Sequence, residues 1–160
     1  MQRLFLMRHS YAASGGYTDE ERPLTDAGRS LVNRIAPLLA ESPPDLILAS
    51  TAVRATETAE LIQLGLNNAP EIHRLERLYL APPTAYVQAA LDIRDAAESI
   101  MVVGHNPGMA SLVNSWSDAL MTVLPGCVAV FESHNGQWPL SDVGPTPTLT
   151  EYYSKGVRVV

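Results

Sequence analysis

Short apolar runs recur along the chain, and charged or imidazole side chains follow each of them closely. Runs of four to eight apolar residues that end in turn signals are typical of buried strands. The pattern therefore predicts three strands that each deliver Arg or His at their carboxyl end. The runs are Leu4–Met7 before Arg8-His9-Ser10, Leu46–Ala49 before the segment from Ser50 to Arg54, and Ile100–Val103 before Gly104-His105-Asn106.

Apolar residues at helical spacing fill the intervals between these strands. We expect helices over 25–41, with a kink at Pro37, over 51–64 and over 82–97, and a fourth that begins near Pro107. An edge strand is expected over 71–74 and another strand over 128–132, where a tight turn at 134–136 adds one antiparallel strand. Strands that alternate with helices predict an α/β fold. We expect a three-layer α/β/α sandwich with a mostly parallel central sheet and one antiparallel strand, in a single domain over residues 1–160.

The carboxyl ends of parallel strands meet at one edge of a sheet, where such folds bind their ligands. Two imidazoles and at least two guanidinium groups would therefore gather at one place in a chain whose formal net charge is -6. A concentrated positive site of this kind predicts an anionic ligand. Phosphate fits best, because the guanidinium fork matches its oxygens and a histidine ring can attack phosphorus or carry a proton near neutral pH.

Four motifs in order make the chain resemble the histidine phosphatase superfamily. The short length and the Gly-His-Asn-Pro form are most similar to the SixA-type phosphohistidine phosphatases. The resemblance extends from residue 2 to about residue 131. The motifs are Arg8-His9-Ser10, Arg22-Pro23-Leu24-Thr25, the segment from Ser50 to Arg54-Ala55 with Thr58-Ala59 behind it, and Val103-Gly104-His105-Asn106-Pro107.

The resemblance implies a role for each residue of the site. His9 would be the nucleophile, attacking as the neutral imidazole and forming a phosphohistidine intermediate. His105 would stabilise the charge on the phosphoryl oxygens, and Arg8 and Arg54 would hold the remaining oxygens. The other residues expected to bind substrate are Arg22, Ser10 and Asn106.

The sequence leaves open which group protonates the leaving group. It is one of two carboxyls, or no group of the protein is needed. Glu76 stands where the family's general acid is expected, and a solvated Glu76 between two arginines is the other interpretation. Asp19, in the loop after the first strand, is the alternative acid. A phosphohistidine substrate would need no strong acid, because imidazole leaves more readily than an alkoxide.

Composition excludes several other classes of protein. The chain has 160 residues, which suffices for one domain with a core, and its acidic balance argues against a nucleic-acid-binding surface. The lone Cys127 excludes an internal disulfide and is expected to be a small buried hydrophobe. No run resembles a membrane span or a signal-peptide core, which predicts a cytoplasmic protein with no membrane partner. No cofactor and no metal are expected.

Other functions remain as alternatives. A metallohydrolase could use His9, His105, Glu76 and Asp19 as ligands, although arginines beside them would repel a divalent cation and no metal-ligand spacing appears. A phosphate-binding module without catalysis would need no nucleophile. A small-molecule phosphatase or mutase of the same superfamily would use the same chemistry. Only about six residues separate the second expected helix from the edge strand, which leaves little chain for a lid and favours an open site for a phosphorylated protein.

Overall fold

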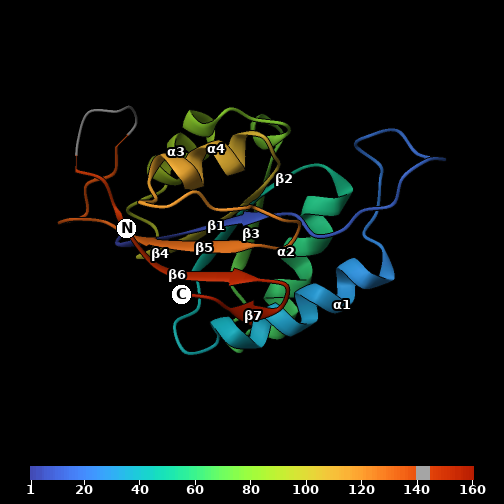
Figure 1. Cartoon of the computed structure of the whole chain (residues 1–160), viewed down its shortest axis with the longest axis horizontal. Coiled ribbons are helices and arrows are strands. Elements are labelled where there is room, and N and C mark those ends of the chain that lie inside the picture. The colour runs from blue at the N-terminus through green and yellow to red at the C-terminus, as the bar shows by residue number, and fades with distance from the viewer. Residues whose placement is uncertain (140–144) are drawn as a thin grey trace.

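The computed structural model describes residues 1–139 and 145–160, and a seven-stranded sheet runs through the middle of the molecule (Figure 1). The strand order is β3-β2-β4-β1-β5-β6-β7. The strands are β1 (Arg3–Arg8), β2 (Leu46–Ser50), β3 (Glu71–Leu75), β4 (Ser99–Gly104), β5 (Val128–Glu132), β6 (Thr148–Ser154) and β7 (Val157–Arg158).

Four neighbouring strands, β3, β2, β4 and β1, run parallel, because a helix connects each to the next in the chain. In the register of β1 and β4, Arg8 lies opposite Gly104. The first residues beyond these two strands, His9 and His105, therefore leave the sheet side by side. Ser50, the last residue of β2, ends at the same edge. The predicted convergence of strand ends is confirmed.

The other half of the sheet is antiparallel throughout. β5 pairs with β1, β6 with β5, and β7 with β6, each in antiparallel fashion. The α/β sandwich is confirmed, but β5, β6 and β7 are all antiparallel where the sequence predicted one such strand. The turn at 134–136 is closed by a bridge between His134 and Gln137, and the strand that pairs with β5 is β6 rather than the residues directly after this turn. The sequence hides β6 because its Thr-Leu-Thr-Glu start has little apolar character, and only Tyr152 and Tyr153 are buried there.

Helices cover both faces of the sheet, as Figure 1 shows. Alternate residues of β1 point to opposite faces, so Phe5 and Met7 pack under α1 and α2, whereas Leu4 and Leu6 pack under α3 and α4. Cys127 is free and buried, as predicted. The helices are α1 (Asp26–Ile35), α2 (Val53–Gly65), α3 (Pro83–Asp92) and α4 (Gly108–Ser115), with 3₁₀ turns η1 (Ala36–Leu39) and η2 (Glu76–Leu78).

Two helices are shorter than the sequence predicts. Thr25 caps α1 by accepting from Gly28 N, but the α-helix ends at Ile35 and continues as the 3₁₀ turn η1. Pro37 lacks the N–H that an α-helical hydrogen bond would need. α3 ends at Asp92 rather than near residue 97. No helix of the described residues is long and apolar enough to cross a membrane.

Candidate active site

His9 leaves the end of β1 with its ring fixed in one orientation. Nδ1 lies 2.7 Å from the carbonyl oxygen of Ser10, and because a carbonyl only accepts, Nδ1 carries the hydrogen. Nε2 is left with a lone pair, and it accepts from Arg54 Nε at 3.2 Å. The side chain is only 8 % exposed. His9 is thus held as a neutral imidazole whose lone pair faces Arg54.

His105, at the end of β4, has its ring fixed by a side chain from β2. Its Nε2 lies 2.8 Å from Ser50 Oγ. Ser50 Oγ also accepts a hydrogen bond from Ala52 N. Among the described residues, His105 Nε2 is the one acceptor that the Ser50 hydroxyl hydrogen can reach. The hydroxyl therefore donates to Nε2, which leaves the hydrogen of His105 on Nδ1. Nδ1 is buried and has no hydrogen-bond partner in the described structure.

The backbone of His105 is held by Tyr86, a fully buried residue of α3. The Tyr86 hydroxyl accepts from His105 N at 3.0 Å and donates to His105 O at 3.2 Å. The approach requires glycine at position 104, since a Cβ there would collide with the Tyr86 ring. The two histidine rings lie 5.1 Å apart between centroids. Both imidazoles are thus placed by buried groups.

Three arginines surround the two rings. Arg54, in the first turn of α2 and 3 % exposed, donates through Nη1 to Asp19 O at 2.5 Å and through Nη2 to Asp19 Oδ2 at 3.0 Å. Arg8 Nη1 donates to Val123 O at 3.0 Å. The Nε atoms of Arg8 and Arg22 are buried without a partner in the described structure, as Nδ1 of His105 is. Unsatisfied buried donors of this kind are expected where a ligand supplies the acceptors.

Burial keeps both imidazoles neutral. Burial is the largest of the effects that together lower the pKa of His9 from its ordinary value of 6.5 to about 4; the charges of Arg54, Arg8 and Arg22 act in the same direction, and the Ser10 carbonyl opposes them. Burial, together with repulsion from His9 and Arg54, lowers the pKa of His105 to about 3. At neutral pH the site combines uncharged histidines with charged arginines, which suits a nucleophile beside an anion.

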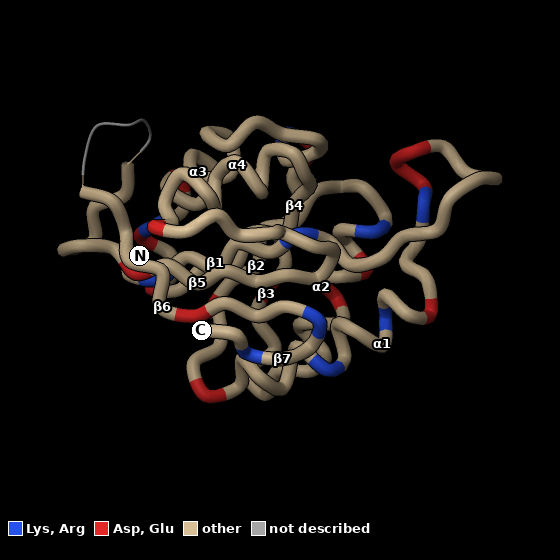
Figure 2. The backbone as a smooth tube through the Cα atoms, viewed as in Figure 1, with Lys and Arg blue, Asp and Glu red and all other residues tan. Residues whose placement is uncertain are grey.

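The loop after β1 reaches back over the site through Asp19. Figure 2 shows acidic and basic stretches side by side in this loop. Besides Arg54, Asp19 contacts Arg22 Nη1 at 3.3 Å and accepts a short hydrogen bond from the Tyr79 hydroxyl. That hydrogen bond and the arginines hold the pKa of Asp19 below its ordinary value. Asp19 is therefore ionised at neutral pH, and its carboxylate covers Arg54. The site is more covered than the short α2–β3 connection suggests.

Tyr79 belongs to the site, although the sequence did not single it out. It follows η2, at the end of β3, and its ring lies edge-on to His105 with 5.6 Å between centroids. The signal that could have found it is its position, since it follows a fourth parallel strand at the same edge. Ser50 and Tyr86 were also missed as groups that orient His105, because no motif rule assigns partners across strands.

Of three further predicted site residues, two make side-chain contacts within the protein and one is exposed. Ser10 is fully buried, and its hydroxyl donates to Gly28 O at 2.9 Å. The Asn106 amide donates to Val123 O and accepts from Ala110 N, which ties it to the start of α4. Glu76 is exposed at the start of η2. Substrate binding by Ser10 and Asn106 and acid catalysis by Glu76 stay predictions.

The arrangement can bind a tetrahedral oxyanion and attack its central atom. Three arginines and His105 Nδ1 supply donors, and His9 Nε2 supplies a lone pair. In residues 1–139 and 145–160, no three His, Cys, Asp or Glu side chains lie close enough together to hold a metal ion. The charged donors of the site are the guanidinium groups of Arg8, Arg22 and Arg54.

Comparison with known proteins agrees with this chemistry. A family model described as histidine phosphatase superfamily (branch 1) matches residues 4–79. An uncharacterised protein of Mycobacterium tuberculosis is 31% identical over 140 residues, covering 86% of this chain and 84% of that protein. A structure from Agrobacterium tumefaciens assigned as phosphohistidine phosphatase SixA is 27% identical with a TM-score of 0.79, covering 96% of this chain and 98% of its own.

A second structure assigned to SixA, from Nakamurella multipartitia, has a TM-score of 0.79 at 22% identity and covers 99% of this chain and 97% of its own. This likeness extends over the antiparallel half of the sheet as well as the strands that carry the site. The family model covers β1, β2, β3 and the residues His9 and Arg54. This chain belongs to the histidine phosphatase superfamily and is a phosphatase.

Proposed function

We propose that this phosphatase removes phosphoryl groups from phosphohistidine on another protein, through a phosphohistidine intermediate on its own His9 and without a metal ion. One observation carries the proposal. Two neutral imidazoles lie 5.1 Å apart, and one directs a lone pair toward Arg54 while the other has an N–H with no partner among the described residues. A nucleophile and an oxyanion donor are what phosphoryl transfer to the enzyme requires.

In the first step, the lone pair of His9 Nε2 attacks phosphorus and forms a P–N bond. The bond from phosphorus to the leaving group breaks, and its electron pair goes with the leaving group. Arg8, Arg22 and Arg54 bind the phosphoryl oxygens, and His105 Nδ1–H donates to one of them. The phosphoryl group draws Arg54 away from Asp19 and from His9 Nε2, which frees the lone pair for attack.

In the second step, water attacks the phosphohistidine. A P–O bond forms, the P–N bond breaks, and its electron pair returns to His9 Nε2. The proton of the attacking water goes to solvent, and inorganic phosphate leaves. The burial that lowers the pKa of His9 favours the neutral ring that this step regenerates.

The leaving group favours a phosphohistidine substrate. Asp19, one candidate acid, has a lowered pKa and holds no proton to give at neutral pH. Glu76, the other candidate, is exposed beside η2. Phosphohistidine whose second ring nitrogen is protonated releases neutral imidazole, so that no acid at the site is needed. Glu76 keeps its role as acid only for substrates that release an alkoxide.

Two further observations support a protein substrate. Only residues 66–70 connect α2 to β3, so this connection has little chain to enclose a small molecule. Structures named as SixA share the fold, and one of them is complexed with tungstate, an oxyanion of the same shape as phosphate. We also propose that the chain forms a single domain and acts in the cytoplasm.

The test is phosphate release, in the presence of a chelator, from a phosphohistidine peptide and from an aryl phosphate. Wild type and His9→Ala are compared side by side. The proposal predicts release from the peptide by wild type, a higher kcat/KM for the peptide than for the aryl phosphate, and no release by His9→Ala. Equal activity of His9→Ala would overturn the mechanism. Release from the aryl phosphate alone would assign the site to small phosphate esters.

A further inference from the structure

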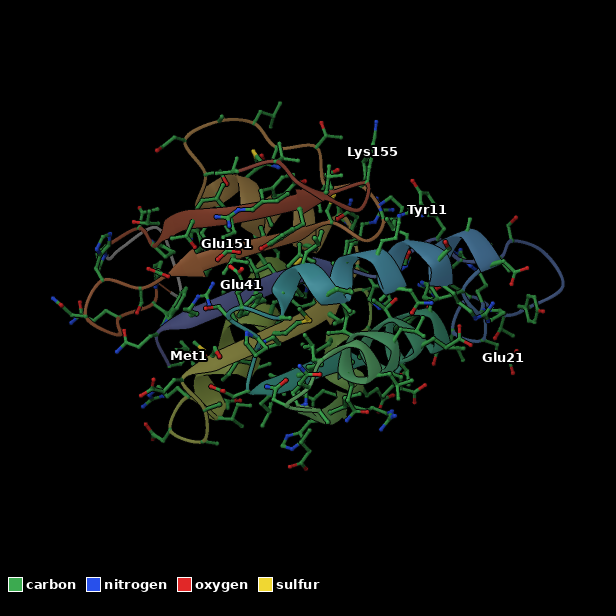
Figure 3. The ribbon with its side chains drawn as sticks, turned by 90° about the horizontal axis from the view of Figure 1, so that it is seen from below. Met1, Tyr11, Glu21, Glu41, Glu151 and Lys155 are labelled. Carbon is green, nitrogen blue, oxygen red and sulfur yellow. The ribbon has the colours of Figure 1, made fainter. Side chains whose placement is uncertain are left out.

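A second cationic surface lies beside the active site, outside the groups that the reaction uses. It is a groove of about 300 Å³ between α1 and the turn that joins β6 to β7. Figure 3 shows Tyr11 and Lys155, two of its lining residues, near each other at the same end of the molecule. We call this surface the α1 groove, and it is lined by Tyr11, Ala27, Ser30, Leu31, Arg34 and Lys155.

The α1 groove holds two cations that lack a carboxylate partner. Neither Arg34 nor Lys155 forms an ion pair with any described Asp or Glu, and both are exposed. Arg29, which lies on the same helix, pairs with Glu57 at 3.3 Å and with Asp26 at 3.5 Å. In a chain of net charge -6, two neighbouring cations without acidic partners form a local surface that attracts anions.

The shape of the β6–β7 turn brings these two cations together. Gly156, with φ of +80°, follows Lys155, and a Cβ at that position would lie 2.9 Å from Arg34 Nε. The guanidinium of Arg34 thus packs against the backbone of the turn that carries Lys155. Its Nη1 also donates to Ser30 Oγ at 3.4 Å, which keeps it along the groove. Both charges face one lining surface rather than separate regions of solvent.

The α1 groove lies at the same edge of the sheet as the catalytic centre, because Met7, near the end of β1, and Tyr153, near the end of β6, both pair with Val128 of β5. Tyr11 lies two residues after His9 in the chain. Leu31, from the floor of the groove, lies 2.7 Å from where a Cβ of Gly126 would be, and Gly126 N donates to the carbonyl oxygens of both Arg8 and His9 at 3.1 Å. We therefore expect residues close to the phosphohistidine of a bound polypeptide to reach the groove along this edge.

We propose that the α1 groove binds acidic side chains that flank the phosphohistidine of the substrate protein, with Arg34 and Lys155 pairing with carboxylates. This inference rests on the proposed function and adds the kind of sequence that the enzyme prefers. The exposed hydroxyl of Tyr11 and the hydroxyl of Ser30 supply further hydrogen bonds to the same carboxylates. Exposed pairs contribute modestly, so two of them are expected to change affinity by roughly three- to tenfold.

The test uses two synthetic peptides of equal length, each with one phosphohistidine. Glutamates flank the phosphohistidine in the first peptide, and glutamines replace them in the second. For wild type at low salt, kcat/KM is expected to be roughly three- to tenfold higher for the glutamate peptide, through KM, and high salt should shrink the ratio. The double variant Arg34→Gln/Lys155→Gln should bring the ratio near one.

A matched control removes two cations that do not line the groove, Arg74 of the opposite edge strand β3 and Arg94 of the α3–β4 connection, in Arg74→Gln/Arg94→Gln, and should keep the wild-type ratio. A ratio near one in wild type, or an unchanged ratio in the Arg34/Lys155 variant, would overturn the inference while leaving the proposed function intact. Failure of wild type to hydrolyse either peptide, with the aryl phosphate still cleaved, would overturn the phosphohistidine substrate and the inference with it.

Discussion

The ends of β1 and β4 carry the two histidines of the site, and their surroundings give the two rings opposite chemistry. At the end of β1, a backbone carbonyl binds Nδ1 of His9 and leaves a lone pair on Nε2. At the end of β4, the Ser50 hydroxyl binds Nε2 of His105 and leaves an N–H on Nδ1. Burial lowers both pKa values, so the rings differ in tautomer and not in charge.

In each ring, one nitrogen is bound by the protein and the other faces the substrate. The partner of the bound nitrogen decides whether the other one presents a lone pair or an N–H to the substrate. The partner of His9 belongs to the next residue of the chain, so its orientation follows from the local backbone. The partner of His105 comes from another strand, and a point mutation can remove it. The end of β1 is therefore specified locally, whereas the end of β4 depends on tertiary packing.

The largest effect is expected at the end of β1. His9→Ala removes the lone pair that attacks phosphorus, so turnover should fall by at least about 10⁴-fold, as loss of a nucleophile does in other covalent enzymes. Steady-state phosphate release, with circular dichroism to establish folding, measures this. Turnover within tenfold of wild type would show that water attacks the substrate directly.

A smaller loss is expected at the end of β4. His105→Ala removes one donor to the phosphoryl oxygens while the nucleophile stays, so kcat should fall by about 10²- to 10³-fold. Pre-steady-state kinetics should still detect a phosphoenzyme, formed slowly. Complete absence of phosphoenzyme in a folded His105→Ala protein would mean that both rings are required to form it. That result would contradict His9 as the nucleophile and His105 as a donor only.

Ser50→Ala tests whether the tautomer of His105 matters. Without the hydroxyl, the hydrogen of His105 is free to move to Nε2, and kcat should fall by about ten- to a hundredfold, as for other partners that orient a catalytic ring. Nitrogen chemical shifts of His105 should change toward a mixture of tautomers. Ser99→Ala is the control, since Ser99 lies at the other end of β4 and bonds to Asp45. A lower kcat with unchanged nitrogen chemical shifts would mean that Ser50 does not set the tautomer of His105.

The lowered pKa values of the two histidines predict how stability changes at low pH. Both histidines have lower pKa values in the folded chain than the 6.5 expected when unfolded, so the unfolded chain binds more protons between pH 6.5 and about 3. Their contribution to stability is complete above pH 6.5 and declines as pH falls through this window. Nuclear magnetic resonance titration should find both rings neutral at pH 6. Protonation of His9 near pH 6.5 would contradict the account.

The smallest effect concerns Asp19, which covers Arg54 on the His9 side. Asp19→Asn removes the ionised carboxylate that competes with phosphate for the guanidinium, so inorganic phosphate should bind roughly fivefold more tightly. Calorimetry measures the affinity. Glu21→Gln, in the same loop but bonded to Thr18, is expected to leave it unchanged. Weaker binding to Asp19→Asn would mean that the carboxylate chiefly positions Arg54.

Much of the fold could be predicted because apolar runs and helical spacing specify the parallel half of the sheet. The runs before Arg8, Arg54 and His105 marked the strand ends, and the rule that parallel strands bind ligands at their carboxyl ends placed those residues together. The antiparallel strands β6 and β7 were hidden by a polar, proline-rich tail. Their pairing depends on a neighbour that is already in place rather than on an apolar pattern of their own.

The site was predictable where motifs carry the chemistry and not where partners cross the fold. Arg54 and His105 were expected beside His9 from the convergence of parallel strand ends and from the family motifs. The pairing of Ser50 with His105 and the hydrogen bond from Tyr79 to Asp19 join distant segments, and no local pattern specifies them. The contacts of Asp19 with Arg54 and Tyr79 are of the same kind, and they keep the pKa of its carboxyl below the ordinary value.

Trapping the phosphoenzyme tests the central claim most directly. Wild type is mixed rapidly with a phosphorylated substrate, quenched in alkali to preserve phosphohistidine, digested and analysed by mass spectrometry. The account predicts phosphate on His9, in a chelator as well as without it, and at a burst amplitude close to one per active site when its hydrolysis is slow. Turnover without any phosphorylated His9, or phosphate on His105 instead, would contradict it.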